Sequence, residues 1–238
     1  MDKMVYIAAS GAKQSMQGLA LKANNLANAN TTGFKADFAQ ARSMQAFGEG
    51  LPTRVFSMQE RPGSNMTSGG IIETGRDLDI AMSDNAWLAV QDDSGNEAYT
   101  KVGTLNITAQ GMLVSSHGRQ VIGEGGPVIL PVPIEKISFS EDGAIQVRPQ
   151  GAPANFLEEV DTLRVVEGNS RELEKGNDGL FRPVPGQTVD TSANVKVLSG
   201  ALEMSNVNPV HEMVDMINHQ RQFELQVKLM KTAEEIDE

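Results

Sequence analysis

Asp77 and Asp79 have the residue type and spacing that acid–base chemistry could use. Alternate residues of a strand point to the same face, and two carboxylates at one site can hydrolyse a glycosidic bond. Apart from Arg76, no arginine or histidine lies beside them in a recognisable pattern. A polar strand edge explains the pair at least as well, so a hydrolase is the weakest of three interpretations of this chain.

The remaining candidates for ligand or metal binding match known site patterns poorly. The glycine-rich segment 123–127 lacks the lysine and the following helix of a phosphate loop, and a turn between strands explains it. The acidic segment 92–97 does not have the EF-hand ligand spacing and fits a solvated hairpin. His211 and His219 are too far apart for a metal pair on one helix, and His117 fits a turn. We therefore expect no enzyme activity, no catalytic residue, no metal and no cofactor.

Composition excludes further classes of function. The 238 residues include no cysteine, which removes disulfides, iron–sulfur clusters and thiolate zinc sites. The formal net charge of −11 argues against a nucleic-acid partner. The densest apolar run, 128–134, is too short to span a bilayer, and residues 1–10 lack the apolar core of a cleavable secretory signal. We expect neither insertion into a lipid membrane nor a small-molecule substrate.

The first 30 residues are predicted to form a helix with a coiled-coil seam. They contain no proline, and their apolar residues alternate spacings of four and three. The seam consists of Val5, Ala9, Ala12, Met16, Leu19, Ala23 and Leu26. Because Gly11 and Gly18 each weaken a helix by about 1 kcal/mol relative to alanine, this helix is expected to need a packing partner.

The last segment, from about residue 208, has the matching pattern. Asn208 suits the N-cap, Pro209 suits the first turn, and Glu212 favours the positive end of the helix dipole. The seam consists of Met213, Met216, Gln220, Phe223, Val227 and Met230, and Val210 and Ile217 widen it.

The two ends of the chain differ in charge. Residues 1–42 hold five basic and two acidic side chains, whereas residues 201–238 hold three basic and eight acidic ones. Seam-bearing helices of opposite charge are expected to pair with each other or with copies of themselves. Two surface helices that pack on a central domain are the alternative.

The middle of the chain is predicted to be an antiparallel β domain. Short alternating or apolar runs are separated by turn signals such as Ser94-Gly95 and Asp142-Gly143. The runs are 79–82, 87–90, 99–102, 105–108, 120–122, 137–139, 145–147, 163–166 and 195–198. Strands at this spacing without helical patterns between them indicate an all-β domain.

The expected fold class is therefore α+β, in three parts. Residues 1–30 and 201–238 are expected to form a helical coiled-coil domain, and residues 76–200 a β-rich domain. Residues 31–75 are expected to be an extended connector that contains glycine and proline and has room for one hairpin.

Segment 22–35 is distinctive enough to indicate a family. A helix runs into an asparagine-rich exit, where asparagines satisfy free helix carbonyls or adopt a left-handed conformation. Gly33 then permits a sharp turn, and Phe34 returns to an apolar surface. The segment resembles the N-terminal signature of the bacterial flagellar axial proteins, which are rod, hook and hook-associated subunits. Segment 199–217, with the residues that follow it to 224, resembles the C-terminal signature of the same family.

The part between the two signatures is similar to the same family. Segments 74–80, 87–90, 98–101 and 121–127 resemble the β domain of basal-body rod proteins. The similarity therefore spans essentially the whole chain. The compact length and the junction 206–210 favour the proximal-rod member of the family over its distal-rod relative.

The resemblance implies a structural function. In such proteins the terminal helices form an inner coiled-coil domain, and the β domain lies outside it. Many subunits stack helically into the hollow driveshaft of the flagellar basal body, which crosses the periplasm and transmits motor torque to the hook and filament. The subunits are exported through the flagellar channel without a cleaved signal peptide. The implied partners are copies of the chain, neighbouring rod proteins and the export apparatus.

Two sets of residues follow as candidate sites. The predicted assembly interface consists of Val5, Ala9, Ala12, Met16, Leu19, Ala23, Leu26, Met213, Met216, Ile217, Phe223, Val227 and Met230. The predicted connector and signature residues are Asn24, Asn25, Asn28, Thr32, Gly33, Phe34, Glu203, Ser205, Asn206 and Asn208. The alternative from another class is a monomeric β-domain binding module, an adhesin or carbohydrate binder, with its terminal helices packed on itself.

Overall fold

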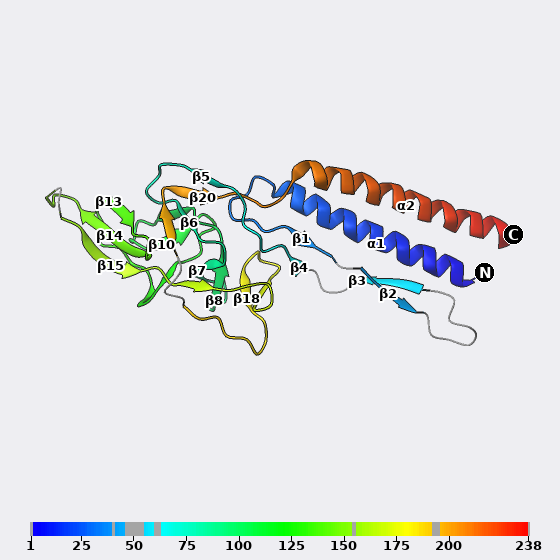
Figure 1. Ribbon diagram of the computed structural model, residues 1–238, viewed down its shortest axis with the longest axis horizontal. Helices are drawn as coiled ribbons and strands as arrows, with labels where there is room; N and C mark the ends of the chain where they lie inside the picture. Colours follow the sequence, from blue (N-terminus) through cyan, green and yellow to red (C-terminus); the bar gives the residue numbers. More distant parts are fainter. Residues whose placement is uncertain are drawn as a thin grey trace. The chain divides into compact units, whose positions relative to one another are not determined.

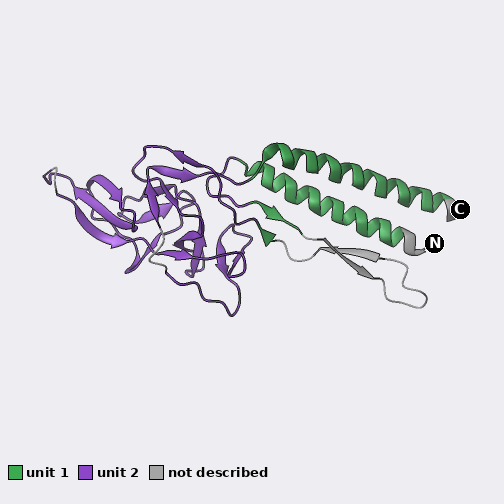
Figure 2. Cartoon of the chain, viewed as in Figure 1, with its two compact units in different colours: residues 1–29, 36–64, 207–238 green, residues 30–35, 65–206 purple. Residues whose placement is uncertain are grey.

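The chain folds into two compact units, which Figure 2 shows in different colours. The computed structural model describes residues 2–39, 41–45, 55–59, 63–153, 156–191 and 196–237. Unit 1 consists of residues 1–29, 36–64 and 207–238, and unit 2 consists of residues 30–35 and 65–206. Two long helices in unit 1 and antiparallel strands in unit 2 confirm the α+β class.

Unit 1 is built on two helices that lie side by side and run in opposite directions (Figure 1). Helix α1 covers Asp2–Ala27 and α2 covers Pro209–Asp237. As predicted, Asn208 caps α2: its Oδ1 accepts hydrogen bonds from the backbone N–H groups of Val210 and His211. Neither helix, over its described residues, is long and apolar enough to cross a membrane.

Two short strand pairs complete unit 1. Strand β1 (Asp37–Phe38) pairs with β4 (Gly63–Ser64), and β2 (Ala41–Gln45) pairs with β3 (Val55–Gln59), both antiparallel. The expected connector therefore contains a hairpin-like strand pair. Its residues 40, 46–54 and 60–62 lie outside the described residues.

Unit 2 consists of strands that all pair antiparallel. They are β5 (Ile71–Glu73), β6 (Ile80–Met82), β7 (Ala86–Gln91), β8 (Glu97–Thr100), β9 (Leu105–Ile107), β10 (Leu113–Ser115), β11 (Ile122–Gly123), β12 (Gly126–Pro127), β13 (Ile134–Phe139), β14 (Ala144–Pro149), β15 (Glu158–Thr162), β16 (Val165–Glu167), β17 (Leu173–Lys175), β18 (Phe181–Pro183), β19 (Val197–Ser199) and β20 (Ala201–Glu203). The largest sheet has the strand order β16-β7-β8-β18-β17, and a second has the order β13-β14-β15. The antiparallel β domain predicted from the alternating runs is confirmed.

Strand β7 is buried on both faces, which places it at the centre of unit 2. Leu88 and Val90 point into the larger apolar cluster, whereas Trp87 and Ala89 point into a second, smaller one. Adjacent side chains of a strand face opposite sides, so one strand can supply two cores. Its near-continuous apolar sequence follows from that position.

The division into units differs from the sequence-based ranges at β20. This strand, which the sequence analysis assigned to the C-terminal helical part, pairs with β5, which it assigned to the connector. Both strands belong to unit 2. The prediction missed them because β5 directly follows Gly69 and Gly70, which indicated a connector, and β20 lies in the segment of the C-terminal signature. Of the predicted run 195–198, residue 195 lies outside the described residues, Lys196 precedes β19, and Val197 and Leu198 begin it.

Candidate functional site

The face of α1 that packs on α2 is made of small and polar residues. Ala8, Ala12 and Ser15 are buried, at spacings of four and three. Two turns further along, Lys22 Nζ lies 2.9 Å from Asp215 Oδ2 and 3.3 Å from Glu212 Oε2. Burial lowers the pKa of Lys22, but these two carboxylates outweigh it and hold the pKa above its ordinary value. Small side chains allow close approach of the helices. The ion pairs of Lys22 join the basic N-terminal segment to the acidic C-terminal segment.

Large apolar side chains of both helices remain exposed within the chain. Met16 on α1 is 62% exposed, and Ile217 on α2 is 51% exposed. Others that are exposed in the same way are Val5, Tyr6, Val210, Met213, Val214, Leu225 and Leu229. Exposed apolar residues that gather along one element mark an interaction surface.

Some of the predicted interface residues are buried or partly buried within the chain, and others are exposed. Ala12 is buried, and partly buried ones are Leu19, Ala23, Leu26, Met216, Phe223, Val227 and Met230. Exposed ones are Val5, Ala9, Met16, Met213 and Ile217. The stripe buried within the chain therefore follows Ala8, Ala12 and Ser15 and shares only part of the predicted seam. Contacts between chains remain a prediction.

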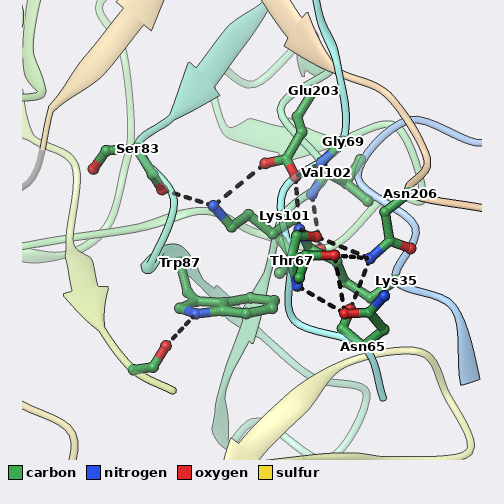
Figure 3. Close-up of polar contacts among 12 residues, drawn as sticks. Lys35, Asn65, Thr67, Gly69, Ser83, Trp87, Lys101, Val102, Glu203 and Asn206 are labelled. Carbon is green, nitrogen blue, oxygen red and sulfur yellow. Dashed lines mark hydrogen bonds and ion pairs between the residues drawn. The ribbon is translucent and has the colours of Figure 1, made fainter. Parts of the chain in front are cut away.

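A second site, inside unit 2, is a buried cluster of three charged residues (Figure 3). Lys35 Nζ lies 2.6 Å from Glu203 Oε1, and Lys101 Nζ lies 3.3 Å from Glu203 Oε2. The side chains of both lysines are 0% exposed and that of Glu203 is 2% exposed. The cluster thus holds two cations and one anion, an arrangement that is stable only when hydrogen bonds complete it.

Backbone groups provide those hydrogen bonds. Lys35 Nζ donates to the Thr67 carbonyl at 2.9 Å, and Lys101 Nζ donates to the Ser83 carbonyl at 2.7 Å. The backbone N–H of Gly69 donates to Glu203 Oε1 at 3.0 Å. Burial lowers the pKa of Lys101 to about 8, and the positive charge of Lys35 adds to this, while Glu203 opposes it.

The indole of Trp87 lies beside the two ammonium groups. Lys101 Nζ is 5.5 Å and Lys35 Nζ is 6.0 Å from the ring centroid, within the range of a cation–π interaction. The ring also contacts Phe181, with 4.4 Å between centroids, and its N–H donates to the Gly168 carbonyl. The cluster therefore lies against side chains of β7 and β18 in the largest sheet.

The N- and C-terminal signatures meet at this cluster. Gly33 N–H donates to the Glu203 carbonyl at 2.8 Å, and the backbone N–H of Asn206 donates to the Phe34 carbonyl. The Asn206 side chain donates to the carbonyls of Asn65 and Thr67, at 2.8 and 2.9 Å. Residues 35, 65 and 206 each border a point where the chain passes between units. The chain passes between the units at four points. Within unit 2, the hydrogen bonds around the cluster link the segments that lead to three of them.

Gly33 makes the sharp turn that the sequence predicts, with a φ of 69°. No described residue other than glycine has a positive φ, so the asparagines of the helix exit do not adopt the left-handed conformation. Instead, Asn28 Nδ2 donates to the Asn24 carbonyl. Asn25, which is buried, exchanges two hydrogen bonds with the backbone of Asp37. The alternative in which asparagines satisfy backbone groups is the correct one.

The other signature residues lie close by. Phe34 is partly buried, and the Lys175 ammonium stands 4.1 Å from its ring centroid. Thr32 and Ser205 are partly buried in unit 2. Asn208 belongs to unit 1, where it caps α2. The signature residues are therefore divided among the end of α1, the surroundings of the cluster and the start of α2.

The residues considered for catalysis or ligand binding lie in turns or in hydrogen-bond networks that stabilise the fold. Asp77 is exposed in a turn and does not share a strand face with Asp79, so that prediction is wrong. Asp79 is buried and accepts hydrogen bonds from Arg76 and Thr74. The glycine-rich segment 123–127 forms the β11–β12 turn. Among the described residues, no group of three or more His, Cys, Asp or Glu side chains is arranged to hold a metal ion.

Comparison with known proteins agrees with both signatures. A model of the flagella basal body rod protein matches residues 5–35, and a model of the flagellar basal body rod FlgEFG protein C-terminal matches residues 198–238. A model of the flagellar hook protein FlgE/F/G D1 domain matches residues 81–147. The flagellar basal-body rod protein FlgF of Escherichia coli K12 is 38% identical over 99% of this chain and 95% of its own length. The chain belongs to the flagellar basal-body rod protein family.

Other members of the rod protein family match over their full length as well. FlgF of Salmonella typhimurium LT2 is 37% identical over 99% of this chain and 95% of its own. The rod protein FlgG of Agrobacterium fabrum C58 is 30% identical over 98% of this chain and 96% of its own. The resemblance inferred from the two signatures is therefore confirmed.

Two functional-site residues were missed by the sequence-based selection. Lys35 and Lys101 lie inside segments 22–35 and 98–101, which resemble the rod family. Of the three cluster residues, however, only Glu203 was predicted to be a site residue. The available signal was the position of Lys101 inside the predicted strand run 99–102, directly after β8. A lysine there must find a buried counter-charge.

Proposed function

We propose that this chain is a structural subunit of the proximal rod of the bacterial flagellar basal body. It assembles helically, with copies of itself and with neighbouring rod proteins, into the hollow driveshaft that carries motor torque to the hook and filament. The full-length similarity to rod proteins named FlgF carries this proposal. The exposed apolar residues of α1 and α2 support it, because a rod subunit must bury such surface between copies.

The assembly surface is the set of exposed apolar side chains on the two helices. Met16 of one subunit would pack against Met213 and Ile217 of a neighbour, together with the other predicted interface residues. Exposed alanines such as Ala9 permit close helix approach, and flexible methionines adapt to neighbours that are not identical. Stiffness then comes from repeating this contact along the rod.

The proposed route to the rod rests on the resemblance to axial proteins of the flagellum. The chain would pass through the flagellar export channel without cleavage of a signal peptide and would then reside in the periplasmic rod. The export apparatus is accordingly a transient partner. We propose that the chain acts as a structural subunit and does not catalyse a reaction. No comparison and no feature of the described residues favours the adhesin or carbohydrate binder.

Replacing Ile217 with aspartate should block incorporation into the rod. The side chain is half exposed, so each subunit interface would lose only the burial of that exposed half, worth about 1–1.5 kcal/mol, and would gain a buried charge, which costs more. We expect the variant to be exported but absent from purified basal bodies, and swimming in soft agar to be lost.

The matched control is Asn218→Asp, which adds the same charge at the next, exposed position. It should assemble and swim. Both variants should unfold in urea at the wild-type midpoint when Trp87 fluorescence reports on unit 2. Normal incorporation of the Ile217→Asp protein would count against the proposed surface.

A further inference from the structure

Two glycines of α1 form notches that each receive a polar side chain of α2. A Cβ atom built on Gly18 would lie 2.7 Å from Cε1 and 2.9 Å from Nε2 of His219. A Cβ built on Gly11 would lie 3.0 Å from Cδ of Gln226. The imidazole and the amide therefore pack directly on the α1 backbone. A side chain at Gly18 would force the imidazole to move, whereas one at Gly11 would require the Gln226 amide to shift by a few tenths of an ångström.

The notches and the Lys22 ion pair follow one antiparallel register. From Gly11 to Gly18 and on to Lys22, α1 advances by steps of seven and four residues. From Gln226 to His219 and on to Asp215, α2 retreats by the same two steps. Three separate contacts thus agree on a single alignment of the helices.

We infer that Gly11, Gly18 and Lys22 fix the register in which α1 pairs with α2 of the same chain. The pairing is specified by two notches and one ion pair, and the large apolar side chains remain exposed. This inference does not depend on the proposed function, because it concerns contacts within one chain.

The ion pair is needed because the notches alone do not exclude a slip by one heptad. Since the glycines are seven residues apart, a slip could place Gln226 on Gly18 or, in the opposite direction, His219 on Gly11. Such a slip moves Lys22 by about 10 Å along α2, out of reach of both Asp215 and Glu212. Lys22 therefore selects the observed register from the one that the glycines would also accept.

The absence of cysteine from the sequence permits a direct test in the purified full-length chain. One reporter carries Gly11→Cys and Gln226→Cys, which face each other in the observed register. The other carries Gly11→Cys, Gln226→Ala and Ala233→Cys, and positions 11 and 233 would face each other after a slip of one heptad. Both reporters therefore lack the Gly11 notch to the same extent, and their comparison tests Gly18 and Lys22. With a short thiol-specific cross-linker in dilute solution, we expect roughly ten-fold more intramolecular product from the first reporter, because the second pair is about 10 Å further apart. Equal yields from the two reporters, including no product from either, would overturn the inference.

Substitutions in the first reporter then test the residues that set the register. Glycine-to-alanine changes normally favour helix formation, but Gly18→Ala should lower the cross-linking yield about five-fold because the methyl group displaces His219. Adding His219→Ala should restore the yield. Lys22→Glu, introduced into both reporters, should raise the cross-linking yield of the slipped reporter relative to that of the first. Adding Asp215→Lys should restore the original ratio of yields.

These paired changes separate a register role from a general loss of helix. If Gly18→Ala raises the yield, or if His219→Ala fails to rescue it, then the notch does not set the register. If Lys22→Glu leaves both reporters unchanged, then the ion pair does not select between registers. Helix content measured by circular dichroism should stay within the wild-type range in the rescued variants.

Discussion

Glu203→Gln is expected to destabilise unit 2 by about 3 kcal/mol or more, because it removes the only anion from a buried cluster that holds two lysines. The amide is nearly the same size as the carboxylate, so the loss comes from charge and not from a cavity. Urea unfolding followed by fluorescence of Trp87, the single tryptophan of the chain, measures it directly.

The same substitution in an exposed ion pair is the control. Glu141 lies 3.6 Å from Lys196, and both side chains are more than three-quarters exposed, at 79% and 76%. Glu141→Gln should therefore change the free energy of unfolding by about 0.5 kcal/mol or less. A similar small effect for Glu203→Gln would contradict the account of the cluster.

The destabilisation by Glu203→Gln should also depend on pH. The pKa of Lys101 is about 8 in the folded chain, below its ordinary value of 10.5. At pH 9 Lys101 is largely neutral, so the variant then lacks a counter-charge for only one lysine. The loss measured at pH 9 should accordingly be smaller than the loss at pH 7.

Gly33→Ala is expected to cost about 3 kcal/mol or more, through two effects that add. Its φ of 69° costs a residue with a Cβ about 1–2 kcal/mol. The added Cβ would also clash with the backbone carbonyl of Lys101, so the signature would have to move away from the charge cluster. The same urea titration measures the loss, and the variant should incorporate poorly into basal bodies.

Gly75→Ala separates these two effects. Gly75 has a φ of 68°, but nothing lies within 4 Å of a Cβ built on it. It should therefore lose only the conformational part, about 1 kcal/mol. Equal losses at Gly33 and Gly75 would show that the close approach to Lys101 contributes nothing.

The helices and the β domain were predictable because each buries a face and so carries a period in its sequence. Which face of α1 packs on α2 was not predictable in the same way. Apolar spacing selected Val5, Ala9 and Met16, which the structure leaves exposed, whereas Ala8 and Ser15 are buried. Small and polar residues fill the contact within the chain, and an apolar pattern does not detect them.

The charge cluster was partly accessible from the sequence. Both signatures pointed to Gly33 and Glu203, and the structure brings these residues together. Only the place of Lys101 in a predicted strand run indicated a buried lysine, and Lys35 gave no such signal, because a lysine is almost always exposed unless a partner distant in the sequence pairs with it. Lys35 and Glu203 are 168 residues apart, and only the folded chain shows that they meet.

A density map of intact basal bodies, from the bacterium that makes this protein, tests the central claim most directly. The account predicts that the chain fits density in the proximal rod, with the exposed apolar residues of α1 and α2 buried between neighbouring subunits. A complete rod whose density contains no copy of this chain would contradict the account.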